Sequence, residues 1–73
     1  MDEIKMSIYT SRVLNAIGRQ AEENAVGTTL FREVQRAVGL SDAETWEVLR
    51  ELEGRGFIET GRAINDTYIR IKK

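Results

Sequence analysis

Residues 31–58 read FREVQRAVGLSDAETWEVLRELEGRGFI, two amphipathic stretches that only three residues, Gly39-Leu40-Ser41, separate. The apolar residues on each side recur at the three-four spacing that places them on one face of a helix. They are Leu30, Phe31, Val34, Ala37 and Val38 before the turn, and Thr45, Val48, Leu49 and Leu52 after it. Because the connection is so short, two helices joined by it must cross steeply, as in a helix-turn-helix motif.

Capping signals predict where these two helices begin and end. Thr29 is placed to be the N-cap of the helix that precedes the turn, which we expect within residues 28–38. Gly39 suits the left-handed backbone that ends a helix. Ser41-Asp42-Ala43-Glu44 has the spacing of a capping box, in which the serine and glutamate side chains satisfy each other's backbone N–H groups. The second helix is therefore expected over residues 42–53.

A β-hairpin is predicted after the second of these helices. Gly54-Arg55-Gly56 ends that helix, and residues 57–60 and 67–72 have the alternating pattern of strands on either side of a turn over residues 61–66. Ile69 and Ile71 would point inward. The opposite face of the last strand would then carry Tyr68, Arg70 and Lys72.

A further helix is predicted before the motif. Val13, Leu14, Ile17 and Ala21 share a helical face, so we expect a helix from residue 10 to about residue 24, capped by Thr10 or Ser11. Residues 1–9 are expected to form a separate N-terminal arm, because two of their apolar side chains point away from that face. The arm is a candidate dimerisation segment through Ile4, Met6, Ile8 and Tyr9. The alternative is that it extends the first helix or frays.

The order helix, helix, three-residue turn, helix and hairpin resembles the winged helix-turn-helix family, which includes MarR-like, ArsR-like and PadR-like repressors and small archaeal and viral regulators. Residues 31–41 and 49–58 carry the resemblance, which covers about residues 10–73. It implies an α+β domain of three helices with a C-terminal β-hairpin wing. It also implies sequence-specific binding of double-stranded DNA by a transcription regulator, with residues 42–53 in the major groove and the wing, residues 57–72, on the backbone. A homodimer would supply two half-sites.

This resemblance selects candidate DNA-binding residues. In this family the helix in the major groove is the recognition helix, here residues 42–53. Its side away from the apolar stripe carries the candidate base-reading residues Ala43, Glu47 and Arg50, flanked by Glu44 and Trp46. The candidates for the DNA backbone lie outside that helix. The sequence predicts a basic rim around it, formed by Arg32, Arg36, Arg55, Arg62, Arg70, Lys72 and Lys73, and Tyr68 shares a strand face with Arg70 and Lys72. The alternative for each arginine is an ordinary solvated surface position.

Two features of the recognition helix depart from a typical repressor. Five carboxylates, those of Asp42, Glu44, Glu47, Glu51 and Glu53, oppose the single Arg50, and this acidity disfavours DNA phosphates. Trp46 is large for a surface position. It has three interpretations, namely packing under the first helix or the wing, insertion against DNA, or anchoring a protein partner. The alternative function is therefore a winged-helix protein-interaction module, for example in a replication assembly, that uses the acidic helix and this tryptophan.

Composition excludes several other function classes. The chain has 73 residues, a formal net charge of −1, and neither cysteine nor histidine. Disulfides, thiolate or imidazole zinc sites and Cys-His or Ser-His catalysis are excluded, so we expect no enzyme, no metal and no small-molecule cofactor. No long apolar stretch and no leader pattern is present, which predicts a cytoplasmic protein without a membrane partner.

Overall fold

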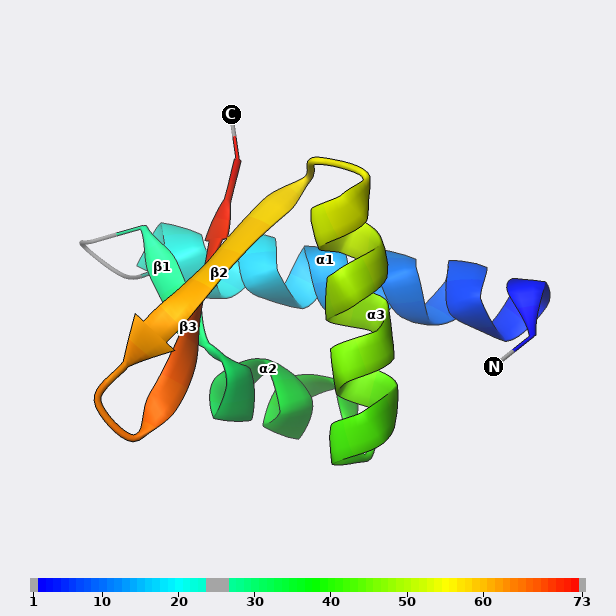
Figure 1. The fold of residues 1–73 in the computed structure, drawn as a ribbon, viewed down its shortest axis with the longest axis horizontal. Helices are drawn as coiled ribbons and strands as arrows, with labels where there is room; N and C mark the ends of the chain where they lie inside the picture. Colours follow the sequence, from blue (N-terminus) through cyan, green and yellow to red (C-terminus); the bar gives the residue numbers. More distant parts are fainter. Residues whose placement is uncertain (1, 24–26, 73) are drawn as a thin grey trace.

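Three helices pack against one face of a three-stranded antiparallel sheet in the computed structural model, which describes residues 2–23 and 27–72 (Figure 1). Met1, residues 24–26 and Lys73 lie outside the described residues. The element order is α1 (Glu3–Glu23), β1 (Thr28–Leu30), α2 (Phe31–Val38), α3 (Asp42–Gly54), β2 (Ile58–Ala63) and β3 (Asp66–Ile71). The strands lie in the order β1-β3-β2. The predicted α+β class, with three helices and a C-terminal hairpin, is confirmed.

The core lies between the helices and the inner face of the sheet. Its buried apolar residues come from all three helices and from two strands: Val13, Ile17, Phe31, Val34, Val48, Leu49, Leu52, Ile58 and Ile69. Thr45 is fully buried as well, and its hydroxyl donates to the Ser41 carbonyl at 2.7 Å. The predicted buried stripe of α3 is therefore confirmed, residue by residue.

The turn between α2 and α3 has the predicted capping geometry. Gly39 takes the left-handed conformation, with φ 71°, and its N–H donates to the Gln35 carbonyl at 2.8 Å. At the start of α3, the Glu44 N–H donates to Ser41 Oγ at 3.1 Å and the Ser41 N–H donates to Glu44 Oε1 at 3.2 Å. Both halves of the capping box are thus present and satisfy backbone N–H groups at the start of α3. The Gln35 side chain, which donates to the Leu40 carbonyl and to Asp42, links the end of α2 to this turn.

The predicted start of the first helix is wrong. α1 begins at Glu3 rather than at Thr10 or Ser11, and the Thr10 hydroxyl donates to the Met6 carbonyl inside the helix. The reason is that Met6 and Tyr9 continue the buried face of α1 and pack against the core. Tyr9 lies three residues after Met6 and four residues before the buried Val13, which is the spacing of one helical face. Residues 3–9 are the first turns of α1, which is the alternative that the sequence left open.

Residues 28–30 form a short strand that was predicted as helix. β1 pairs antiparallel with β3, so Thr29 is not an N-cap. Leu30 occupies that position without a side-chain cap, and helix α2 begins at Phe31. The Thr29 hydroxyl instead donates to the side-chain oxygen of Gln20 on α1. This bond ties β1 to α1.

The hairpin is longer and its turn tighter than predicted. β2 continues to Ala63 and β3 starts at Asp66, so only Ile64 and Asn65 form the turn rather than residues 61–66. Asn65 supplies the positive φ, 63°, that a tight turn requires of one residue. Among the described residues, no helix is both long enough and apolar enough to span a bilayer.

Candidate nucleic-acid interface

The exposed side of α3 carries the predicted base-reading residues. Ala43, Glu47 and Arg50 are all exposed, on the side of the helix away from its buried stripe. Glu44 is half-buried at the capping box. The capped first turn and the packing of α3 on the core give this surface a rigid support.

Trp46 packs on α2. Its ring stacks on Phe31, with centroids 4.6 Å apart and planes 22° apart, and 36% of the residue stays exposed. The inward interpretation of Trp46 holds in part, because the partner is the first residue of α2 rather than α1 or the wing. The stack joins the two helices of the motif through aromatic surface.

The carboxylates of α3 interact with other groups of the protein. Glu44 forms the capping box, and its pKa lies below the ordinary value because the Ser41 backbone N–H and hydroxyl hydrogen-bond it. Asp42 accepts from the Gln35 side chain, and Glu53 accepts from the Thr60 hydroxyl at 2.8 Å. Glu51 forms an ion pair with Arg55 at 2.7 Å. Much of the acidity of α3 therefore has a structural explanation.

Two of the predicted backbone-contact arginines are engaged in ion pairs. Arg55 pairs with Glu51, beside a groove between α1 and the C-terminal half of α3 that Met6 and Thr10 also line. Arg70 pairs with Glu59 across β3 and β2. Arg55 thus lies toward α1 and not on the exposed face of α3.

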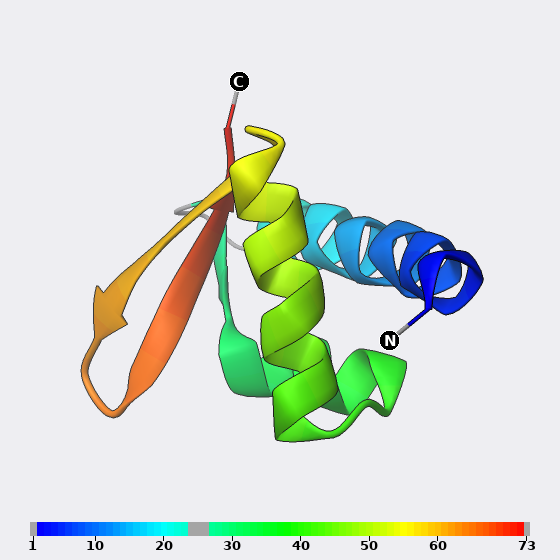
Figure 2. The ribbon, with the colours of Figure 1, turned by 45° about the vertical axis from the view of Figure 1, so that its right-hand side comes forward.

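Strand register divides the predicted basic rim between two faces. Directly paired residues share a face of a sheet, so Arg62 and its partner Thr67 lie on the inner face, with Thr60, which bonds to α3. Tyr68 and Arg70 lie on the outer face, which no helix covers (Figure 2). Arg32 and Arg36 are exposed on α2. The rim expected as one surface is therefore two surfaces.

Two further arginines were not selected from the sequence. Arg12 and Arg19 lie on α1 and line a groove of about 450 Å³ between α1 and α2, together with Ala37 and Val38. Their seven-residue separation on one helix is visible in the sequence. The groove itself cannot be predicted from the sequence, because it depends on how α1 crosses α2.

No family model matches the chain, no curated protein matches it, and no solved structure matches it. The likeness to known proteins thus rests on the arrangement of the elements. Three helices, the second and third joined by a capped three-residue turn, are followed by an antiparallel hairpin, and this arrangement is winged-helix-like.

Proposed function

We propose that this protein binds double-stranded DNA and regulates transcription, with α3 in the major groove and the inner side of the hairpin on the neighbouring backbone. The observation that carries the proposal is the exposed Ala43, Glu47 and Arg50 face of a helix that is capped, buried on its other side and joined to α2 by a helix-turn-helix turn. An α-helix presented in this way fits the major groove.

Charge around α3 supports contacts with phosphates. Four arginines on α2, α3 and β2 lie outside the ion pairs of Arg55 with Glu51 and Arg70 with Glu59: Arg32 and Arg36 on α2, Arg50 on α3, and Arg62 on β2. All four are exposed. If each contacts one phosphate, the logarithm of the affinity falls with the logarithm of the salt concentration with a slope of about −3 to −4.

The DNA proposal is tested by fluorescence anisotropy of a labelled duplex at several salt concentrations. Arg50→Ala and Arg62→Ala are each expected to weaken binding and to reduce the salt slope by about 1. Arg55→Ala is the matched control, because its guanidinium pairs with Glu51 beside α1. If all three variants bind as the parent does, α3 and the hairpin do not hold the duplex.

We further propose that the protein is a homodimer through the first turns of α1. Ile4 and Ile8 lie one turn apart and are 75% and 49% exposed, whereas Met6 and Tyr9 face the core. Changing both isoleucines to serine is expected to shift the molecular weight in sedimentation equilibrium from dimer to monomer. Ile64→Ser, which removes an isoleucine that is 92% exposed, is the control. A parent protein that sediments as a monomer at high concentration contradicts this proposal.

The second candidate function is a protein-interaction module, and the excess of carboxylates on α3 favours it. Trp46 offers a partner an aromatic surface held in place by Phe31. A basic partner would bind with an affinity that Arg62→Ala leaves unchanged and that Glu47→Lys reduces. Two results together would favour this function: no binding of duplex DNA at low salt, and binding of a basic protein partner that responds to the two variants in this way.

A further inference from the structure

The outer face of the sheet remains without a role in the proposed duplex interface. All three helices pack on the other face. Helices α1 and α2 contact β3, and α3 contacts β2. The outer face carries Tyr68, Arg70 and Lys72, which the sequence selected as one group. Their surface differs from the exposed face of α3, so its use does not depend on how α3 binds DNA.

The ring of Tyr68 lies flat at the centre of this outer face. Tyr68 is paired with Leu30 on one side and with Gly61 on the other. A Cβ built at Gly61 would overlap the ring carbons Cε2 and Cζ and the hydroxyl oxygen Oη of Tyr68. The three separations are nearly equal, as they are for a point above the plane of the ring. One face of the ring therefore rests on the glycine backbone. The other face points away from the sheet, toward the side that no helix covers.

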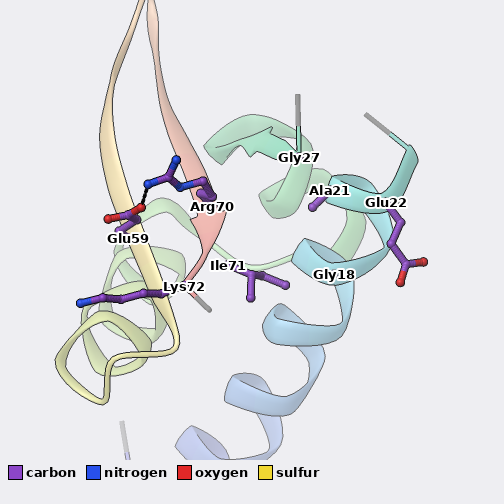
Figure 3. A pocket seen from close by; sticks show the side chains of 8 residues that line it. All are labelled: Gly18, Ala21, Glu22, Gly27, Glu59, Arg70, Ile71 and Lys72. Carbon is purple, nitrogen blue, oxygen red and sulfur yellow. Dashed lines mark hydrogen bonds and ion pairs between the residues drawn. The ribbon is translucent and has the colours of Figure 1, made fainter. Parts of the chain in front are cut away.

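Two cations follow the ring along the same strand face. Arg70 and Lys72 are exposed and lie two and four residues beyond Tyr68, whereas Ile71 points toward Gly18 of α1 (Figure 3). The Arg70 side chain is 55% exposed, and only its Nη2 donates to Glu59. Because a guanidinium has five N–H donors, this ion pair orients Arg70 and leaves donors for a second anion.

A hollow adjoins these cations at the end of β3. It measures about 680 Å³, Gly18, Ala21 and Ile71 contribute apolar surface, and Arg70 and Lys72 lie at its border (Figure 3). The carboxylates of Glu22 and Glu59 line the hollow as well, and Glu59 is the ion-pair partner of Arg70, which leaves Lys72 as the cation outside that pair. Along the outer face of β3 and beyond its end, the ring of Tyr68 is followed by the cations of Arg70 and Lys72. A ligand in which a flat ring is followed by phosphates matches this order.

We propose that the outer face of the sheet binds single-stranded nucleic acid, with a base stacked on the free face of Tyr68 and the following phosphates held by Arg70 and Lys72. Stacking on a flat aromatic ring combined with backbone-tracking cations is how proteins bind single strands without sequence preference. A duplex is a poor occupant, because its bases already stack on one another and offer no free face to the ring.

The test is anisotropy of a fluorescein-labelled (dT)12 strand, and of the matching (rU)12 strand, at low salt. Tyr68→Leu keeps an apolar side chain over Gly61 and is expected to weaken binding about fivefold or more, whereas Tyr68→Phe binds as the parent does. Phe57→Leu is the control, since it changes an aromatic residue that is 46% exposed elsewhere. Arg70→Ala and Lys72→Ala should each reduce the salt slope by about 0.7.

The outcomes separate this proposal from duplex binding by α3. Arg50→Ala should leave binding of the single strand unchanged, and an unlabelled duplex should not displace it. Binding of either the DNA or the RNA strand supports the proposal, and the stronger of the two identifies the natural ligand class. Displacement by duplex, a Tyr68→Leu variant that binds as the parent does, or no binding of either strand at low salt would overturn it. Circular dichroism of Tyr68→Leu checks that the variant is folded.

Discussion

The ring of Tyr68 lies directly on Gly61, its partner across β3 and β2, so closely that a methyl group at residue 61 would overlap two ring carbons and the hydroxyl oxygen. Glycine normally weakens a strand, and here the aromatic side chain covers the exposed backbone. The contact lies within the paired part of the hairpin, in which β2 continues through Gly61 to Ala63.

A double-mutant cycle tests this contact. Gly61→Ala is expected to reduce the free energy of unfolding by about 1–3 kcal/mol, because the ring must leave its place. In a Tyr68→Ala background, the same change should be neutral or stabilise by about 0.5 kcal/mol, since alanine is better than glycine in a strand. Urea unfolding of the four proteins gives the coupling. Additive effects of the two changes would show that the ring does not rest on Gly61.

Two leucines on the buried face of α3 are expected to contribute strongly to the stability of the protein. Leu49→Ala and Leu52→Ala should each reduce the free energy of unfolding by about 2–5 kcal/mol, because both side chains are buried in the core. Leu30→Ala is the matched control at a position that is 38% exposed, and it should cost far less. The measurement is the denaturant midpoint, and an unchanged midpoint for Leu52→Ala would mean that α3 is rotated about its axis.

Gly18 offers a stabilising change. It lies inside α1, and a Cβ there would meet Ile71 Cδ1 at 3.8 Å, an ordinary van der Waals contact. Gly18→Ala should therefore stabilise the protein by about 0.5–1 kcal/mol through helix propensity. Gly56→Ala is the opposite control, because Gly56 has φ 80° and alanine is strained there. Thermal melting compares the two, and a destabilised Gly18→Ala variant would show that the glycine is needed for packing.

The capping box predicts a pH dependence of stability. The pKa of Glu44 is lowered in the folded protein by its hydrogen bonds with Ser41, so the folded state binds a proton less readily than the unfolded state. The stabilisation is present above the unfolded pKa of about 4.3 and is lost as the pH falls through the lower folded value. Glu44→Gln should melt below the parent at about pH 6, with the difference shrinking at about pH 3. A difference that does not change with pH would contradict this account.

Local signals in the sequence were sufficient for the helix-turn-helix. The capping box of Ser41 and Glu44 depends only on residues close in sequence, and the buried stripe of α3 follows from spacing. The predicted start of α1 is wrong because the positions of Ile4 and Ile8 do not indicate its buried face, which Met6 and Tyr9 continue. Three-residue β1 is defined by its pairing with β3, which no local pattern in residues 28–30 reveals.

The candidate site was predictable only where it lies on one helix. The exposed positions of Ala43, Glu47 and Arg50 follow from helical geometry alone. Arg62 and Arg70 lie on opposite faces of the sheet because of the strand register. The two-residue turn sets this register, whereas the longer turn predicted over residues 61–66 does not determine it. The ion pair between Arg70 and Glu59 follows from the same register.

Trp46 is the single tryptophan of the chain and stacks beside the exposed face of α3, so its fluorescence reports on that surface. The most direct measurement is a titration with random-sequence duplex DNA at about 50 mM and then about 200 mM salt. Our account predicts a saturable change in Trp46 emission at low salt that weakens strongly at the higher concentration. An emission spectrum that does not change, together with no shift of the duplex on a gel at low salt, would contradict DNA binding through α3.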